Sequence, residues 1–166
     1  MTTTTKPLLA HTAGDLMTQN VVMLPKEMSL QKAARLLSQH QISGAPVVDE
    51  EGRCIGIVSS TDFIKLAGSE HADVGRHATA AADCLCAWQL VEPDQLPADQ
   101  VGAHMTKDPV MVVPQASIGK LARLMIDAHI HRVVVRDEAR RPIGVVSSTD
   151  ILAAIAKAEP FNPDEI

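Results

Sequence analysis

Aromatic side chains are almost missing from this sequence of 166 residues: they make up 2% of it, with two Phe, one Trp and no Tyr. Stacking of bases on aromatic rings is the usual platform for single-stranded nucleic acid, so that platform is scarcely available here. The net charge is −5, and no run of Lys or Arg is present to neutralise a phosphate backbone. We therefore expect no nucleic-acid partner.

Long apolar runs are also missing. A membrane-spanning helix needs about 18 or more consecutive apolar residues, and no segment of the sequence approaches that length. The first six residues, Met1–Lys6, lack the apolar stretch of a secretion signal. The sequence therefore predicts a cytoplasmic protein without membrane contact, whose three cysteines stay reduced.

Residue sets that would carry catalysis are not apparent. The sequence shows no nucleophile–base set and no phosphate-binding P-loop, so we expect no enzyme activity and no required cofactor. Cys84 and Cys86 form a C-x-C pair, with His71 and His77 upstream. Four such residues could hold zinc, but two small buried thiols are the simpler explanation of the pair. We predict no metal site.

The sequence does contain an internal repeat. Residues 17–62 recur as residues 105–150 at a constant offset of 88 residues, and almost half of the aligned positions are identical. Hydrophobic residues make up 46% of the chain, which is long enough to bury a sizeable core. Duplicated units of this length usually pack against each other. The repeat therefore predicts an α/β module in which two copies share a pseudo-twofold axis and form two related clefts.

Each copy has the element order β-α-β-β-α. Ser29 and Ser117 fit the N-cap position of a helix, where a serine hydroxyl accepts a backbone N–H. The helices that follow carry one apolar stripe each, with spacing i, i+3, i+4, i+7: Leu30, Ala33, Ala34 and Leu37, and then Ile118, Leu121, Ala122 and Met125. Two β-rich runs with a polar turn between them predict a hairpin in each copy.

The repeat sets the domain boundaries. We expect an N-terminal tail over 1–12, a first repeat over 13–67, a connector over 68–100, a second repeat over 101–157 and a C-terminal tail over 158–166. The connector has an Ala-rich part that could be helical, but its structure stays open. Met17, Met23, Met105, Met111 and Met125 fall at positions expected to pack in the core.

The segment Gly-x-Val-Ser-Ser-Thr-Asp occurs twice and ends at Asp62 and Asp150. An aspartate just after a strand can accept hydrogen bonds from the vicinal hydroxyls of a ribose. Hydroxyls at the start of the next helix also suit a phosphate; these belong to Ser59 and Thr61 in the first copy, and to Ser147 and Thr149 in the second. Ordinary helix capping would use the same residue types, but the duplication favours ligand binding.

Together with the Met-Thr pairs at 17–18 and 105–106, these motifs make the sequence resemble a tandem pair of CBS domains, the type named after cystathionine β-synthase. The first copy matches through residues 42–49 and 56–62, the second through residues 131–135 and 144–150. The resemblance implies that adenosine-containing ligands, such as AMP, ADP, ATP or S-adenosylmethionine, bind in the clefts between the repeats. It implies that the aspartate holds the ribose. It also implies a homodimer that signals its ligand state to an unidentified partner protein.

The two copies differ where the family binds phosphate. The second copy is similar to the last repeat of the γ subunit of AMP-activated protein kinase and carries His131-Arg132, where the first copy has Ser43-Gly44. Arginine has a forked donor set suited to phosphate oxygens. We therefore expect a phosphorylated ligand in the cleft around Asp150. The family pattern gives this cleft the following residues: Ser147, Thr149, His131, Arg132, Thr18, Ile42, Ser43 and Gly44.

The opposite cleft would use Asp62, Ser59, Thr61 and Thr106, and we expect it to bind phosphate more weakly or to be empty. Two alternatives stay open. S-adenosylmethionine carries a sulfonium and no phosphate, so it would not need Arg132, and His131-Arg132 would then be a surface pair beside a strand. The clefts could also be vestigial in a protein that serves only in structure or interaction.

Overall fold

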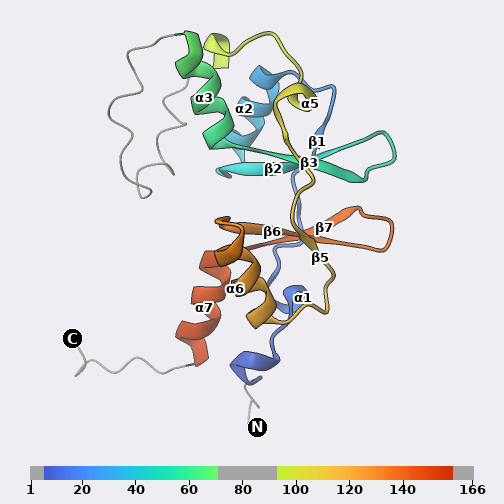
Figure 1. The fold of residues 1–166 in the computed structure, drawn as a ribbon, viewed down its shortest axis with the longest axis vertical. Helices are drawn as coiled ribbons and strands as arrows, with labels where there is room; N and C mark the ends of the chain where they lie inside the picture. The colour runs from blue at the N-terminus through green and yellow to red at the C-terminus, as the bar shows by residue number, and fades with distance from the viewer. Residues whose placement is uncertain (1–5, 71–92, 159–166) are drawn as a thin grey trace, which may run out of the picture. The chain divides into compact units, whose positions relative to one another are not determined.

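A computed structural model describes residues 6–70 and 93–158 of the chain, and it divides into two compact units. Unit 1 combines the segments Met1–Val21 and Val110–Ile166, and unit 2 is the segment Val22–Pro109. Each unit has its own sheet, with its two long helices on one face (Figure 1). The predicted mixed α/β architecture with two repeats is confirmed.

Unit 2 contains a four-stranded sheet of order β1-β2-β3-β4. Strand β1 pairs parallel with β2, while β3 pairs antiparallel with both β2 and β4. Its elements, in chain order, are β1 (Leu24–Pro25), α2 (Leu30–Gln39), β2 (Gly44–Val48), β3 (Cys54–Ser59), α3 (Ser60–Glu70), η4 (Pro93–Gln95), α5 (Val101–His104) and β4 (Thr106–Lys107).

Unit 1 repeats this arrangement with the sheet order β5-β6-β7. In place of a fourth strand, Thr18 forms an isolated antiparallel bridge with Val145. Its elements, in chain order, are η1 (Leu8–Ala10), α1 (Ala13–Leu16), β5 (Met111–Val112), α6 (Ile118–Asp127), β6 (Arg132–Arg136), β7 (Pro142–Ser147) and α7 (Ser148–Ala158).

The predicted helix starts are confirmed. Ser29 Oγ accepts the backbone N–H of Lys32 at 3.3 Å, and Ser117 Oγ accepts that of Lys120 at the same distance. Both helices also end alike, because Gln41 and His129 follow them with φ of 53° and 52°. The next amide in each case bonds back to the helix, Ile42 N to Leu37 O and Ile130 N to Met125 O, both at 3.0 Å. This is the Schellman type of helix end.

The apolar stripes make the two cores. In α2 all four predicted stripe residues are buried, whereas in α6 Ala122 is only half-buried and the other three are buried. The predicted packing of the methionines is confirmed for Met125, which is buried. It is wrong for Met23, which is 43% exposed because it lies just before the short strand β1, on the side away from the core.

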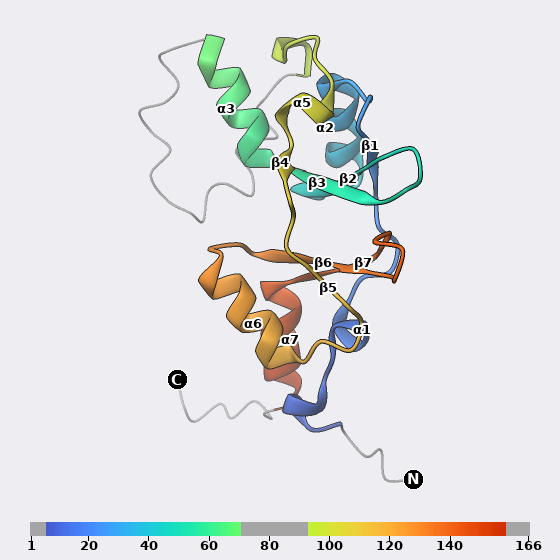
Figure 2. The same ribbon diagram turned by 45° about the vertical axis from the view of Figure 1, so that its right-hand side comes forward.

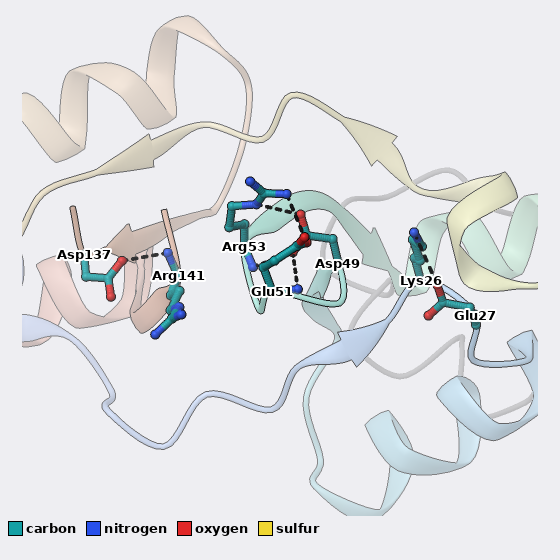
Figure 3. Close-up of polar contacts among 7 residues, drawn as sticks. All are labelled: Lys26, Glu27, Asp49, Glu51, Arg53, Asp137 and Arg141. Atoms are coloured by element: carbon teal, nitrogen blue, oxygen red, sulfur yellow. Dashed lines mark hydrogen bonds and ion pairs between the residues drawn. The ribbon is translucent and has the colours of Figure 1, made fainter. Parts of the chain in front are cut away.

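Hairpins join the central strands of both units, as predicted. In the β2–β3 turn, the Asp49 carboxylate accepts the backbone N–H of Arg53 at 2.9 Å and its guanidinium at 2.8 Å (Figure 3). In the β6–β7 turn, the Asp137 carboxylate accepts the backbone N–H of Arg141 at 2.8 Å. An aspartate thus closes each turn by accepting a backbone N–H from the far side.

Ordered structure reaches into two segments that the sequence analysis left outside the repeats. Residues 6–12 of the expected tail include η1, and Thr12 bridges to Ser117. At the end of the expected connector, η4 contacts α2 and Leu96 is buried in the core of unit 2. The Ala-rich part of the connector lies outside the described residues.

Candidate functional site

The two motif aspartates occupy the third position of the helix that follows the second hairpin strand of each unit, β3 or β7. Asp150 Oδ2 accepts the backbone N–H of Ser147 at 2.7 Å and its hydroxyl at 2.6 Å. Asp62 Oδ2 accepts the corresponding groups of Ser59 at 2.8 and 2.9 Å. A carboxylate at this position that accepts the N–H of the residue before the helix is half of a capping box. The capping alternative is therefore confirmed for one oxygen of each carboxylate.

The second oxygen of each carboxylate, Oδ1, takes no part in capping. Within the described parts of the chain, neither Asp62 Oδ1 nor Asp150 Oδ1 accepts a hydrogen bond. Both side chains are half-buried, and the bonds at Oδ2 fix their orientation. A carboxylate held in this way keeps acceptor capacity for a hydroxyl pair. Capping and binding of a diol are thus compatible uses of the same side chain.

In unit 1, Arg132 lies near the carboxylate of Asp150. It opens strand β6 and pairs with Ser147 across the β6–β7 ladder. Partial burial lowers the pKa of Arg132, and the Asp150 charge opposes that shift. The guanidinium has no hydrogen bond or ion pair with any other described residue, although a buried charge is normally paired. An anion would satisfy it.

Three further predicted residues surround the same strand end. Thr18 exchanges backbone hydrogen bonds with Val145 at 3.0 and 3.2 Å, and its side chain is exposed. His131 accepts the backbone N–H of Ser148 through its carbonyl at 2.9 Å and exposes its ring. Thr149 is exposed in the first turn of α7. Unit 1 therefore brings together six of the predicted residues: Thr18, His131, Arg132, Ser147, Thr149 and Asp150.

Unit 2 gathers the counterparts with Gly44 at the position of Arg132. The backbone carbonyl of Ser43 accepts the backbone N–H of Ser60 at 2.7 Å. Gly44 pairs with Ser59 across the β2–β3 ladder. A Cβ on Gly44 would lie 3.0 Å from the Val58 carbonyl oxygen, so a larger residue is disfavoured there. Thr106 pairs with Ile57, as Thr18 does with Val145. Ile42, Ser43 and Gly44 belong to unit 2, and their contribution to the Asp150 site stays a prediction.

The net negative charge of the chain lies in unit 2. The segment Val22–Pro109 has seven Lys and Arg against twelve Asp and Glu, a net charge of −5, whereas unit 1 has eight of each and is neutral. A local negative field disfavours anionic ligands. The charge difference thus has the same direction as the Arg132–Gly44 difference.

Sequence reasoning missed how the Met-Thr segments are positioned. Met17 packs directly on Gly144: a Cβ added to that glycine would lie 2.3 Å from Met17 Sδ. Met105 packs in the same way on Gly56, at 2.5 Å. These contacts hold Thr18 and Thr106 at the sheet edge next to the motif serines. The signal was the occurrence of Met-Thr and of the motif glycine in both copies.

Other predicted features find less support. Cys84, Cys86, His71 and His77 lie outside the described residues. Among residues 6–70 and 93–158, no group of three or more His, Cys, Asp or Glu is placed to hold a metal ion. No helix within those ranges combines the length and apolar character needed to cross a bilayer.

Comparison with known proteins agrees with the duplicated architecture. The family model of the CBS domain matches residues 13–69 and 100–157. The uncharacterized protein MJ1426 of Methanocaldococcus jannaschii is 26% identical over 150 residues, which cover 85% of this chain and 89% of that protein. A homoserine O-acetyltransferase of Methanohalobium evestigatum is also 26% identical, but this chain spans only 24% of its length.

Two solved structures have a similar fold. CBSX2 of Arabidopsis thaliana, in complex with AMP, is 25% identical with a TM-score of 0.67, and the match covers 89% of this chain and 97% of that one. The CBS domain pair of protein MJ0100, in complex with 5-methylthioadenosine and S-adenosyl-L-methionine, is 21% identical with a TM-score of 0.69 and covers 90% and 99%.

Proposed function

Because this chain belongs to the CBS domain family, we propose that it is a regulatory module that binds an adenine nucleotide (AMP, ADP or ATP) and signals the ligand state to a partner protein. Its similarity to CBSX2, which has been solved with AMP, supports an adenosine-containing ligand. Its role is regulatory and not catalytic, and it needs no cofactor for that role.

The half-buried and unpaired Arg132 beside Asp150 is the observation that carries the choice of a phosphorylated ligand. In the proposed complex, the ribose hydroxyls donate to Asp150 Oδ1, while Arg132 and the hydroxyl of Thr149 donate to phosphate oxygens. Charge-assisted hydrogen bonds contribute about 1.5–3 kcal/mol each, so Arg132 is worth about a tenfold or greater gain in affinity. Thr18 and His131 complete the polar surface.

The Asp62 site in unit 2 keeps the ribose acceptor and the hydroxyls of Ser59, Thr61 and Thr106. It has Gly44 at the position of Arg132 and lies in the acidic unit. We therefore propose that it binds the same nucleoside with little preference for a phosphate. The two sites would then report different ligands, or only one would be filled.

Calorimetry with adenosine and AMP separates these contributions. Arg132→Gln should lower AMP affinity about tenfold and leave adenosine binding nearly unchanged, because only AMP has a phosphate. Asp150→Asn should weaken both ligands. Asp62→Asn makes the same change in the unit 2 site, so it should weaken adenosine binding there and leave the preference of the Asp150 site for AMP unchanged. Equal effects of Arg132→Gln on both ligands would contradict the assignment of Arg132 to the phosphate. If the protein binds S-adenosylmethionine and neither adenosine nor AMP, S-adenosylmethionine is the ligand instead.

Signalling requires that the ligand binds two states of the protein with different affinity. We propose a homodimer as the assembly that responds. Sedimentation velocity with and without AMP measures the oligomeric state directly. A monomer under both conditions would remove this part of the proposal.

A further inference from the structure

One segment of unit 1 lies far in sequence from the rest of that unit. This N-terminal segment, residues 6–18, includes η1 and α1, and the chain passes through all of unit 2 before it returns to unit 1 at Val110. Both η1 and α1 contact α7 (Figure 2). The segment is therefore held in unit 1 by noncovalent contacts and not by a short covalent connection.

Backbone hydrogen bonds join the N-terminal segment to the residues that precede α6. Ala13 N donates to Ala116 O at 2.8 Å, and Gly14 N donates to Pro114 O at 2.9 Å. The helical elements of the segment have three and four residues, which is too short for a helix to be stable alone. The structure of the segment therefore depends on its docking, and local opening would expose the amides of Ala13 and Gly14 to solvent.

The N-terminal segment ends at the proposed nucleotide site. Thr18 pairs with Val145, and Ser147 lies two positions further along β7, on the same face of the strand. Diagonal neighbours of this kind lie about 7–8 Å apart, a gap that one polar group of a ligand can bridge through two hydrogen bonds. The hydroxyl of Ser147 donates to Asp150 Oδ2, and the side chain of Thr18 is exposed. A ligand at Asp150 can therefore also contact Thr18.

A cavity places a second part of the same segment next to Asp150. This cavity has a volume of about 230 Å³, and Asp15 and Leu16 of α1 line it together with Asp150 of α7. Departure of the N-terminal segment would thus remove Thr18 from the nucleotide site and open the wall beside Asp150. The docked and the open state of the segment differ at the place where the proposed ligand binds.

We infer that docking of the N-terminal segment and nucleotide binding at Asp150 are coupled through the hydroxyl of Thr18, so that a bound nucleotide holds the segment in place and its loss releases the segment. This inference rests on the proposed function, because it takes the nucleotide site around Asp150 as given. It identifies residues 6–18 as the element through which unit 1 reports its ligand state.

The size of the coupling follows from the contact that the open state loses. A ligand shifts an equilibrium only by its difference in affinity for the two states, and the coupling has the same size in both directions. One neutral hydrogen bond from Thr18 corresponds to about a three- to tenfold difference in affinity. The nucleotide should therefore reduce the open population of the segment by the same factor.

Amide hydrogen exchange, followed by nuclear magnetic resonance on the full ¹⁵N-labelled chain, tests the inference with AMP as the ligand. Ala13 and Gly14 are the probes, because their N–H groups bond across the boundary of the segment and lie outside the proposed ligand contacts. Saturating AMP should slow their exchange about three- to tenfold. Amides of β6 that exchange only by global unfolding should slow by the full mass-action factor, about 100-fold when AMP is 100 times above its Kd.

Thr18→Val removes the hydroxyl and keeps the β-branched shape at an exposed position, so the bridge to β7 should persist. In this variant AMP should no longer slow the exchange of Ala13 and Gly14, and AMP affinity measured by calorimetry should fall about three- to tenfold. Thr106→Val is the matched control, because it makes the same change at the equivalent position of unit 2. It should leave the response of Ala13 and Gly14 to AMP unchanged.

Three results would overturn the inference: AMP binds without slowing the exchange of Ala13 and Gly14, these amides slow by the same factor as those of β6, or Thr18→Val keeps wild-type AMP affinity. Each of them leaves AMP binding, and with it the proposed function, in place. Absence of AMP binding to the wild-type protein would instead refute the nucleotide site and the coupling together.

Discussion

Replacement of Gly144 by alanine should destabilise unit 1, because the space for a methyl group is already filled. A Cβ at this position would lie 2.3 Å from Met17 Sδ, 2.7 Å from its Cγ and 2.8 Å from its Cβ. These distances are far below van der Waals contact, so Met17 must move or the strand must shift. Extra methyl groups in filled spaces cost about 1–3 kcal/mol. We expect a loss of that size in the free energy of unfolding.

Gly119→Ala is the matched control, since the same chemical change at an exposed position of helix α6 meets no atom within 4 Å. Alanine is the better helix former, and this variant should gain about 0.5–1 kcal/mol. Urea denaturation followed by circular dichroism measures both free energies. The two variants should therefore move in opposite directions from the wild type.

A double-mutant cycle identifies the clashing partner. Met17→Ala removes Sδ and Cγ but keeps Cβ at 2.8 Å, so it should relieve part of the cost of Gly144→Ala, and the two changes should be coupled. Met105→Ala should likewise relieve only part of the cost of Gly56→Ala, because a Cβ on Gly56 also meets the Thr106 carbonyl oxygen at 2.9 Å. If Gly144→Ala is as stable as the wild type, or is equally costly with and without the Met17 side chain, the packing argument is refuted.

Three smaller changes test the local structure. Ser117→Ala removes the N-cap of α6 and should cost about 0.5–2 kcal/mol, measured by urea denaturation; no loss would contradict the cap. His129→Gly relieves a left-handed residue at φ 52° and should stabilise by a few tenths to about 1 kcal/mol in the same assay, whereas destabilisation would count against the assigned backbone. Hydrogen bonds from Lys6 and Thr12 hold the pKa of Asp15 far below its usual value. The stability it contributes is present above the unfolded-state pKa near 4 and is lost as pH falls below it. Thermal denaturation from pH 5 downward should thus show a shallower decline for Asp15→Asn than for the wild type, and equal slopes would refute the contribution.

The fold was largely predictable because its signals are local. Ser29 and the stripe from Leu30 to Leu37 specify a capped amphipathic helix within nine residues, and the duplication supplies an independent second instance. The pairing of the two strands in each hairpin follows from the short turn that joins them, which contains Asp49 in unit 2 and Asp137 in unit 1. Met23 shows the limit of this reasoning: its residue type suggested burial, but exposure depends on how the chain enters the short strand β1.

The partition into compact units was not predictable from local signals. The repeat analysis placed Met17-Thr18 at the start of the first copy, yet this segment packs in unit 1 with strand β7 of the second. Thr106 likewise joins β3 of the first copy. In this exchange Thr18 contacts Val145, which is more than 100 positions away in the sequence. A hydrophobic period within one segment cannot predict such a long-range contact. The family resemblance, which assigned Thr18 to the Asp150 cleft and Thr106 to the Asp62 cleft, did indicate it.

Candidate site residues were predictable as a set, but their individual roles were not, and Asp150 shows why. Sequence reasoning offered capping and ligand binding as competing explanations, whereas one carboxylate oxygen caps α7 and the other accepts no bond from the described residues. Capping also fixes the side chain before any ligand arrives, which lowers the entropy lost on binding. In Asp150→Ala, loss of the cap should therefore be visible in stability, and loss of the acceptor in adenosine affinity. If the variant loses stability but keeps wild-type adenosine affinity, capping alone explains this residue, and the proposed ribose contact is wrong.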